Sequence, residues 1–597
     1  MSIPPTEGPG GYPAFDRQFL ASDENFTVIG DGAIGGKAKG LGFIKRVLAE
    51  ACPAGTIPDV AVSIPRLTVV GTDVFAEFME RNGLREIVAS GAPDDRIAHA
   101  FQKAELPVRI VGDLRALIAE MRTPLAIRSS SLLEDALSHP FAGTYATKMI
   151  PNNQPDVATR FQRLVEAIKF VYASTYFRDA QSYRRAIGES AADERMAVII
   201  QEVVGRRHGD RFYPTVSGVI RTYNFYPTGP ARPADGVVHL ALGLGKTIVD
   251  GGMTWSYCPA YPRHGPPHGS VHELMKNSQT TFWAVHMGPP PPYDPINEAE
   301  YLVQGNLADA EYDGVLRRVA STYSAESDRL VLGTGVPGPR VLTFAPLLDL
   351  EDVPLNRVIE RVAAACKAAV GSDVEIEFAM TLDHPGDSAA GGDTTARRTG
   401  PPHRFGFLQL RPTRVADETV EVGGEELAGP RVLAATECVL GHRLLEDVCD
   451  VVYVKPSSFE ARHTRAVAAE IEAINQRLAD EGRFYVLIGF GRWGSSDPWL
   501  GIPVTWPQIS AARVIVEATL PDMNVDPSQG SHFFHNLTSF RVPYLTVRHT
   551  GPHGIDWGWL DRLPAVQEAA FVRHVRTPAP LCVKVDGHAG RGVILHE

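Results

Sequence analysis

The sequence lacks long apolar runs and an excess of positive charge. Its first residues, MSIPPTEGPGGYPAFDRQFL, have no basic start followed by an apolar stretch, and no later run approaches the length of a membrane span. A spanning helix needs about 20 apolar residues, so neither a secretory signal nor a membrane anchor is predicted. The 58 Lys and Arg residues are outnumbered by 70 Asp and Glu, for a net charge of −12. We therefore expect a cytoplasmic protein that binds no nucleic acid and no membrane, with its oligomeric state left open.

Cysteine is scarce and irregularly spaced. The sequence has no C-x-x-C pair and no Cys/His block at the spacing of a zinc site. We expect reduced thiols that pack as small apolar side chains. The 6 cysteines are Cys52, Cys258, Cys366, Cys438, Cys449 and Cys582.

Apolar residues, by contrast, make up 44% of the 597 residues, which is typical of packed domains. Helix-like and strand-like patterns alternate along the chain, so the predicted fold class is α/β or α+β. We predict a flexible Gly/Pro-rich leader over residues 1–24, a large domain over 25–415 and a smaller C-terminal α/β domain over 430–597. The large domain contains an insertion at about 256–345, which includes the proline run GPPPPYDP.

A glycine-rich turn follows the first strand-like residues in IGDGAIGGKAKGLGFIKRVL. Glycines let backbone amides approach an oxyanion, and the helix expected after them adds its dipole. Lys37 or Lys39 would supply a positive charge for phosphate. An ordinary turn with surface lysines explains the segment equally well.

A second segment, LAIRSSSLLEDALSHPFAGTYAT, places Arg128 before a run of serines at the end of a short apolar strand. A planar guanidinium beside hydroxyl groups suits phosphate recognition. The alternative is a serine that caps a helix beside a surface Arg–Glu pair.

Two more segments carry polar residues in apolar surroundings. MAVIIQEVV is interrupted at Gln201 and Glu202, which predicts either backbone contacts to an adenine edge or an edge strand with solvent-facing side chains. ALGLGKTIVDGG ends in GKT, but Leu240 stands where a Walker A loop needs its first glycine. It predicts instead a second glycine loop in which Lys246 and Thr247 contact phosphate.

The strand-like runs VEIEFAM and FGFLQLRPTR are predicted to be antiparallel neighbours joined by a long loop at about 385–403. Glu377, Gln409 and Arg411 alternate with apolar residues in these runs. Carboxylate and amide oxygens suit Mg²⁺, and the arginine suits a transferred phosphate. A cross-strand Glu–Arg ion pair is the alternative.

In order and wording, these motifs resemble the ATP-binding domain of the phosphoenolpyruvate synthase and pyruvate phosphate dikinase family, which has an ATP-grasp-type fold. The resemblance covers roughly residues 25–415. It includes GGKAKGLGFI, RSSSLLEDALSHPFAGTYAT, VIIQEVV, SGVI, GLGKTIVDG, IEF and LQLRP. A series of motifs in one order is far more specific than any single motif.

The resemblance implies ATP and Mg²⁺ as cofactors and assigns roles to individual residues. Lys246 departs from the pattern, because the family usually has an acidic residue after that glycine pair. The implied phosphate-binding residues are Lys37 and Arg128, the adenine-lining residues are Gln201, Glu202 and Val203, the Mg²⁺ ligands are Glu377 and Gln409, and Arg411 contacts the transferred phosphates.

The remaining residues depart from the family. Its phosphorylated histidine in a Thr-x-His-Ala setting is missing, and the roughly 170 residues left are too few for a (β/α)₈ barrel, which needs about 250. Pyruvate is therefore not implied as the substrate.

The C-terminal region offers two constellations of its own. GFGRWGSSDPWLGIPVTW matches G-x-G-x-x-G, but Pro498 favours a loop over the helix that a dinucleotide site requires. Polar residues of this segment would instead line a substrate or phosphate pocket: Arg492, Ser495, Ser496 and Asp497. In SQGSHFFHNLTSF, His532 and His535 would share one face of a helix, which suits a phosphate acceptor or a proton-transfer pair, although such residues are often structural.

These observations predict an ATP-dependent phosphotransferase of the dikinase type. It would transfer phosphate to a histidine, with His532 and His535 as candidates, or to a small molecule. A non-catalytic ATP sensor and an ATP-grasp ligase acting through an acyl phosphate are the alternatives.

Overall fold

The computed structural model describes residues 11–17, 24–132, 134, 143–186, 194–266, 270–383, 403–413, 420–521, 531–587 and 589–597. The chain divides into two compact units. The first comprises Met1–Thr222, Val237–Thr247 and Thr254–Pro412, and the second comprises Tyr223–Gly236, Ile248–Met253 and Thr413–Glu597. Both units combine helices with sheets, which confirms the predicted α/β class. In the described part of the chain, no helix is both long and apolar enough to cross a membrane.

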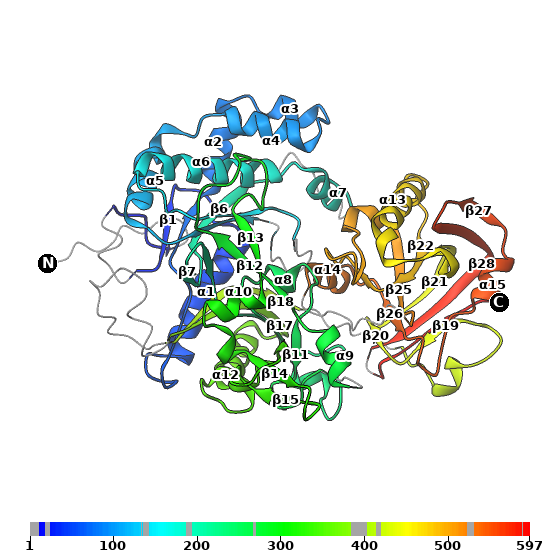
Figure 1. The fold of residues 1–597 in the computed structure, drawn as a ribbon. Helices are drawn as coiled ribbons and strands as arrows, with labels where there is room; N and C mark the ends of the chain where they lie inside the picture. Colours follow the sequence, from blue (N-terminus) through cyan, green and yellow to red (C-terminus); the bar gives the residue numbers. More distant parts are fainter. Residues whose placement is uncertain are drawn as a thin grey trace. The chain divides into compact units, whose positions relative to one another are not determined.

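One sheet of the first unit has the strand order β1-β3-β6-β4-β5. Two of its strands, β1 and β6, are labelled in Figure 1. β1 runs parallel to β3, and the other neighbours are antiparallel. The glycine turn after β1 leads into α1, as predicted, and α1 buries its apolar face. The strands are β1 Phe26–Ile29, β3 Leu67–Val70, β4 Leu125–Ser131, β5 Thr147–Ile150 and β6 Met196–Glu202. The helices are α1 Gly35–Ala51, α2 Thr72–Arg81, α3 Arg85–Ala89, α4 Asp94–Lys103, α5 Val108–Glu120, α6 Val157–Ser174 and α7 Arg178–Ala186.

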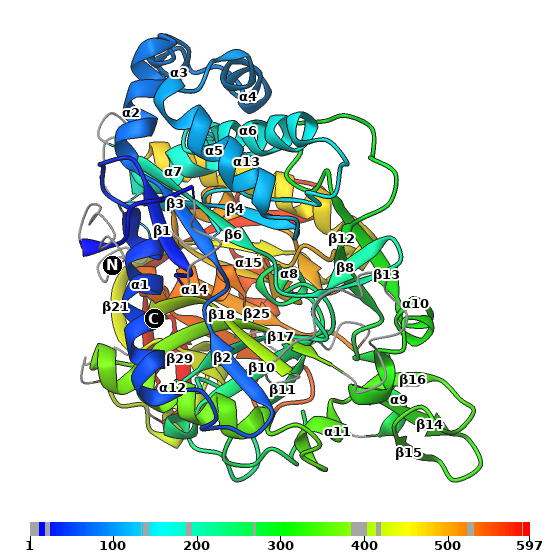
Figure 2. The same ribbon diagram turned by 90° about the vertical axis from the view of Figure 1, so that its left-hand side faces the viewer.

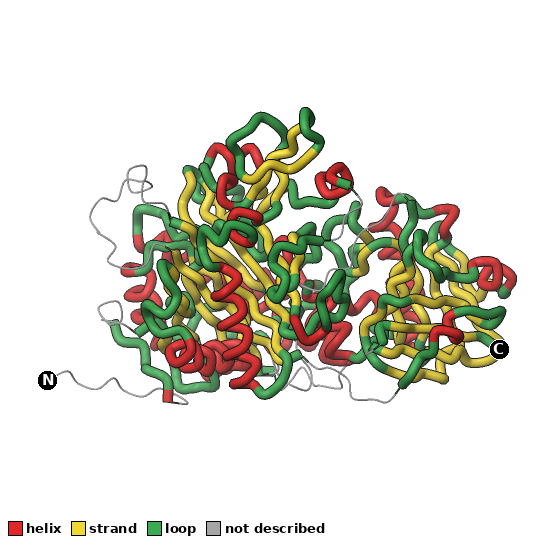
Figure 3. The backbone as a smooth tube through the Cα atoms, turned by 90° about the horizontal axis from the view of Figure 1, so that it is seen from below, coloured by secondary structure: helices red, strands yellow, loops and turns green. Residues whose placement is uncertain are grey.

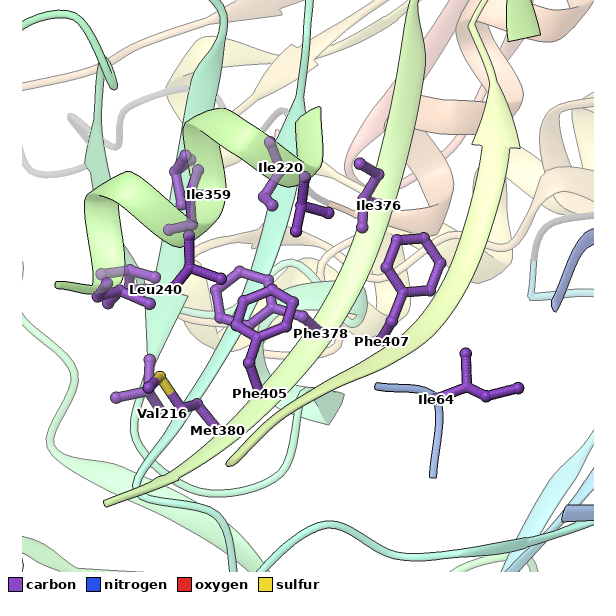
Figure 4. Close-up of a cluster of buried hydrophobic side chains, with 14 of the residues drawn as sticks. Ile64, Val216, Ile220, Leu240, Ile359, Ile376, Phe378, Met380, Phe405 and Phe407 are labelled. Carbon is purple, nitrogen blue, oxygen red and sulfur yellow. The ribbon is translucent and has the colours of Figure 1, made fainter. Parts of the chain in front are cut away.

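A second sheet of this unit has the order β11-β10-β9-β17-β18-β2, and its strands run side by side in Figure 2. The predicted antiparallel pairing of VEIEFAM with FGFLQLRP is confirmed, while the loop between them lies outside the described residues. Figure 4 shows apolar side chains gathered on this sheet, with the rings of Phe378 and Phe405 stacked 4.6 Å apart. The strands are β2 Val60–Ser63, β9 Val216–Arg221, β10 Val237–Ala241, β11 Trp255–Tyr257, β17 Val374–Leu382 and β18 His403–Pro412.

Two smaller sheets, ordered β13-β12-β8-β7 and β15-β14-β16, complete the strands of the first unit that the structure describes. Most of their strands come from the predicted insertion. They are β7 Arg206–His208, β8 Arg211–Tyr213, β12 Thr281–His286, β13 Leu302–Asn306, β14 Ala320–Ser324, β15 Arg329–Leu332 and β16 Arg340–Leu342. The helices of this region are α8 Lys246–Val249, α9 Val271–Lys276, α10 Leu307–Tyr312, α11 Ala345–Leu348 and α12 Leu355–Val370.

The second unit is built on a sheet of order β19-β29-β28-β21-β22-β25-β26-β20, with β27 paired to β28. Its strands appear in yellow beside red helices in Figure 3. The segment ARHTRAVAAEIEAINQRLADEG has apolar residues at helical spacing and ends at Gly482, which predicts a helix, and RFYVLIGF after it predicts a strand. Both are present, as α13 and β22. The strands are β19 Val432–Thr436, β20 Val439–Leu440, β21 Arg443–Val454, β22 Tyr485–Phe490, β23 Arg492–Trp493, β24 Gly501–Ile502, β25 Ala512–Ala518, β26 Tyr544–Val547, β27 Ala565–Glu568, β28 Val572–Asp586 and β29 Arg591–Leu595. The helices are α13 Thr464–Asp480, α14 His532–Phe540 and α15 Trp557–Arg562.

Candidate active site

Arg128 connects the two large sheets of the first unit. It lies on β4, and its Nη1 donates to the Leu408 carbonyl oxygen at 2.8 Å and to Gln201 Oε1 at 3.2 Å. Its Nη2 donates to Gln409 Oε1 at 2.6 Å. A planar guanidinium with several donors can hold β6 and β18 at once, which a lysine ammonium cannot do with the same geometry. Three predicted site residues from separate segments, Arg128, Gln201 and Gln409, are thus brought together.

Polar and charged side chains of β17 and β18 face one another because the two strands are paired. Glu375 faces Arg411 and Glu377 faces Gln409 across the pair. Arg411 Nη1 donates to Glu375 Oε1 at 2.9 Å and also to Glu377. Arg128 Nη2 lies 3.7 Å from Glu377 Oε2. The cross-strand ion pair considered for this position is therefore present, within a network that also contains the predicted phosphate and metal residues.

The network continues into β9, where Arg221 pairs with Glu375. Burial lowers the pKa of Arg221, while the adjacent Glu375 carboxylate acts to raise it. Two carboxylates, Glu375 and Glu377, meet three guanidinium groups, Arg128, Arg221 and Arg411, so the network carries an excess of positive charge. Such an excess in a place shielded from water attracts an anion strongly.

Lys37 is held in the first turn of α1. Its ammonium donates to Glu134 Oε1 at 2.7 Å and to Ser129 Oγ at 3.1 Å, and the side chain is buried. The turn packs so closely against β4 that a Cβ atom on Gly35 would collide with the carbonyl oxygen of Ser130. A glycine is required at this approach, which places the lysine beside the serine run of β4.

The predicted adenine-lining residues lie at the end of β6. Gln201 is buried, and Glu202 accepts a hydrogen bond from the Thr123 hydroxyl at 3.1 Å. The backbone N–H groups of Glu202 and Val203 donate to the carbonyl oxygens of Arg66 and Pro124, both at 2.9 Å. These two donors are therefore engaged within the protein.

Val203 belongs to an apolar cluster that β8 and β12 complete. The ammonium of Lys246, on α8, lies 5.8 Å from the ring centre of Trp283 in this region, and Thr247 follows on the same helix. An apolar cluster beside a cation and the end of a strand suits a flat heteroaromatic ring. The buried members are Ala126, Val203, Phe212, Leu244, Val285 and Met287, with Met149, Trp283 and Leu302 packed against them.

The two candidate histidines belong to the second unit. Both lie on α14, as the spacing required, and the side chain of His535 lies outside the described residues. At the G-x-G-x-x-G segment, Gly491 and Gly494 have positive φ angles of 71° and 73° on either side of the short strand β23. β22 is followed by this strand and by turns, so the helix that a dinucleotide site requires does not open here, as Pro498 predicted.

Sequence reasoning missed four residues of this site: Ser129, Glu134, Arg221 and Glu375. Glu375 could have been predicted, since it lies two residues before Glu377 and therefore on the same face of the strand. For the segment that contains Glu134, the sequence suggested a surface Arg–Glu pair and not a buried partner of Lys37. Arg221 carried no local signal, because its role depends on the pairing of β9 with β17.

A metal ion bound here would need ligands from the nucleotide phosphates in addition to protein side chains. Among the described residues, no group of three or more His, Cys, Asp or Glu side chains could hold one. The carboxylate of Glu377 and the amide oxygen of Gln409, on paired strands, are nevertheless the oxygen donors that Mg²⁺ takes when phosphates complete its shell.

Residues 31–425 match the family described as pyruvate phosphate dikinase, AMP/ATP-binding domain, and the chain belongs to this family. The site of Arg128, Glu377, Gln409 and Arg411 lies within the matched region. The ATP-binding class inferred from the sequence is thereby confirmed.

Curated relatives share part of this region. The chain is similar to phosphoenolpyruvate synthase of Aeropyrum pernix, with 28% identity over 37% of this chain and 26% of the relative. It is similar to rifampicin phosphotransferase of Streptomyces sviceus, with 27% identity over 36% of this chain and 23% of the relative. An uncharacterized phosphotransferase of Bacillus subtilis is 25% identical over 36% of this chain and 22% of the relative. The chain thus matches about a quarter of the length of these proteins.

Proposed function

We propose that this chain is an ATP-dependent phosphotransferase that binds Mg-ATP where the two large sheets of the first unit meet. The observation that carries the proposal is the position of Arg128, which joins Gln201 to Gln409 and approaches Glu377. The family and the names of the relatives support this activity class.

In this proposal the arginines bind and neutralise phosphate oxygens. Arg128 and Arg411 are held by neighbouring side chains before the nucleotide arrives, so little reorganisation is needed when charge develops on the transferred phosphoryl group. Lys37 adds a further positive charge, and Val203 with its apolar neighbours contacts the adenine. Glu377 and Gln409 would hold Mg²⁺ jointly with the phosphates, where the ion supplies charge neutralisation.

The test is to incubate the purified protein with Mg²⁺ and ATP, alone and with a metabolite pool, and to identify the nucleotide product. AMP would indicate dikinase-type chemistry, and ADP would indicate a simple kinase or a ligase. We expect Glu377→Gln to abolish turnover, with Glu326→Gln, at an exposed position, as a control outside the network. Failure of the wild-type protein to consume ATP under every condition would contradict the proposal.

The phosphate acceptor is proposed to be a histidine or a small molecule. For the histidine branch, protein labelling from γ-labelled ATP is compared between the wild type and the His532→Ala and His535→Ala variants. Unchanged labelling and turnover in both variants would eliminate these two residues as acceptors.

One observation favours a second candidate, a non-catalytic ATP sensor. The Lys37 ammonium is engaged by Glu134, and Glu377 is engaged by Arg411 and lies near Arg128, so the expected ligand-binding groups also stabilise one another. ATP would then exchange one set of ion pairs for another and change the conformation without reacting. Saturable ATP binding with no nucleotide product would support the sensor over the enzyme.

A further inference from the structure

One partly exposed segment of the first unit is bounded on both sides by members of the apolar cluster that contains Val203. Residues 288–301, which we call the clasp, connect β12 to β13 and include the proline run of the insertion. Met287 precedes the clasp and Leu302 follows it, and both belong to the cluster. The position of the clasp therefore determines where this side of the cluster lies.

A buried lysine attaches the clasp to β5. The Lys148 ammonium lies 2.7 Å from Glu300 Oε2. It also donates to the carbonyl oxygens of Pro295 at 2.9 Å and Asn297 at 2.8 Å. The side chains of Lys148 and Glu300 are 1% and 3% exposed. Burying two charges is costly unless both are paired and hydrogen-bonded, and each of the three ammonium protons has an acceptor in this arrangement.

Further contacts join the clasp to β5 and α6. The backbone N–H of Thr147 donates to Glu298 Oε1 at 2.8 Å. The Arg163 guanidinium lies 4.8 Å from the ring centre of Tyr293, and the hydroxyl of this tyrosine donates to Glu166 at 2.9 Å. The clasp is thus held at several points along its length by the same two elements.

The strand that holds the clasp also contacts the cluster directly. Met149 follows Lys148 on β5 and packs against the cluster, because successive strand residues point to opposite faces. Asn153, shortly after β5, donates to the carbonyl oxygen of Met287 at 2.8 Å. β5 and the residues after it therefore fix the cluster from two sides, through Met149 and through the clasp.

We infer that Lys148 is a positioning residue that shapes the adenine pocket by holding the clasp. It acts through Met287 and Leu302, which it keeps in place before the nucleotide binds. The inference rests on the proposed function, because it takes the Val203 cluster as the contact for adenine. Without the ammonium, the buried Glu300 carboxylate and two carbonyl oxygens lose their donor, so the clasp is displaced and the pocket must be reordered at binding.

The experiment compares equilibrium binding of ATP and of inorganic tripolyphosphate to the full chain by isothermal titration, with Ca²⁺ replacing Mg²⁺ to slow turnover. Tripolyphosphate has the phosphate groups of ATP but no base, so its affinity reports the arginine site without the apolar cluster. Lys148→Met keeps most of the length of the side chain and removes its charge. We expect it to weaken ATP binding about 10-fold and tripolyphosphate binding less than about 2-fold.

Other variants test the same route to the pocket. Asn153→Ala removes an independent hydrogen bond to Met287 and serves if Lys148→Met does not fold. We expect it to weaken ATP binding several-fold and to leave tripolyphosphate binding unchanged. Lys103→Met, at an exposed lysine on α4 of the same unit, is the matched control and should bind both ligands as the wild type does.

The two ligands also separate this inference from the proposed function. A wild-type preference for ATP that Lys148→Met and Asn153→Ala both retain would overturn the inference alone, as would equal weakening of both ligands, which would mean that Lys148 supports the whole unit. Equal wild-type affinity for ATP and tripolyphosphate would overturn the pocket role and leave the phosphate site in place. A wild-type protein that binds neither ligand and consumes no ATP would contradict the proposed function, and with it the positioning role.

Discussion

The Arg128 guanidinium makes three hydrogen bonds to two strands, β6 and β18, so its geometry matters as much as its charge. Arg128→Lys keeps the positive charge but loses the planar set of donors. We expect kcat/KM for ATP consumption to fall about 10- to 100-fold, with the fold of the first unit retained by circular dichroism. Arg122→Lys, at an exposed arginine shortly before β4, should leave the activity unchanged. Equal activity of both variants would show that Arg128 does not act on the nucleotide.

Asp450, on β21, is a buried carboxylate of the second unit that is surrounded by basic side chains. It accepts hydrogen bonds from His574 at 2.8 Å, Arg576 at 2.9 Å and Arg483 at 2.6 Å. His574 Nδ1 lies 2.7 Å from Arg477, which can only donate, so His574 Nε2 carries the proton that faces Asp450. Burial alone would raise the pKa of Asp450, but these hydrogen bonds outweigh it and lower the pKa to about 2.

A depressed carboxylate pKa stabilises the folded state above the unfolded pKa, and this contribution is lost as pH falls toward 2. We expect Asp450→Asn to lower the free energy of unfolding by about 2 kcal/mol at pH 7, and by about half as much at pH 3. Urea unfolding at the two pH values measures the difference. Asp447→Asn, an exposed position on the same strand, is the control. A pH-independent deficit in Asp450→Asn would mean that packing, not charge, is responsible.

Residue types and alternation predicted Arg128, Glu377, Gln409 and Arg411, because each stands out in a strongly apolar strand. The same logic fails for Glu134 and Arg221. Their partners are distant in sequence, Lys37 for the first and Glu375 for the second, and only strand pairing and helix packing bring them close.

At the scale of elements, strong periodicity was sufficient for α13 and for the β17–β18 pair. Apolar residues at helical spacing predicted α13, and alternation with polar residues predicted the strands. The short strands of the region around 256–345 could not be predicted individually from the sequence. Segments such as β11 and β16 are too short to show the alternation of apolar and polar residues that marks a strand. Their existence depends on neighbours such as β10 and β14.

Gly482, which follows α13, tests how much one helix end contributes. Its φ is 66°, a left-handed conformation that a residue with a Cβ atom adopts at a cost, and a Cβ there would meet no other atom within 4 Å. Gly482→Ala should therefore lower the free energy of unfolding of the second unit by about 1 kcal/mol through backbone strain alone. Chemical denaturation followed by tryptophan fluorescence measures it.

The control is Gly424→Ala, where a Cβ is equally unobstructed and φ is not in the left-handed region. Equal stability of Gly482→Ala and the control would show that the end of α13 relaxes without cost.

At the scale of the molecule, the second unit is not one continuous stretch of chain. Tyr223–Gly236 and Ile248–Met253 lie inside the sequence range of the first unit yet group with Thr413–Glu597. Composition predicted a boundary between 415 and 430 but not the grouping of these two segments with the C-terminal stretch, because that grouping depends on contacts between residues distant in sequence. Tyr226 contacts Phe534, and Gly251 accepts from Arg492, so both segments carry contacts with the C-terminal stretch.

A fragment of residues 413–597 should therefore not fold as the second unit does in the full chain. Without segment 223–236, the ring of Phe534 loses the Phe225 and Tyr226 contacts, and without segment 248–253 the Arg492 guanidinium loses two carbonyl acceptors. Exposing an apolar face costs free energy, and so does leaving a buried charge without its acceptors. The sum of the two costs is on the order of the stability of a small domain. We expect the fragment to bind a hydrophobic dye and to give poorly dispersed amide NMR signals. A cooperative unfolding transition and dispersed signals from the fragment would show that the strands β19 to β29 fold without the two inserted segments.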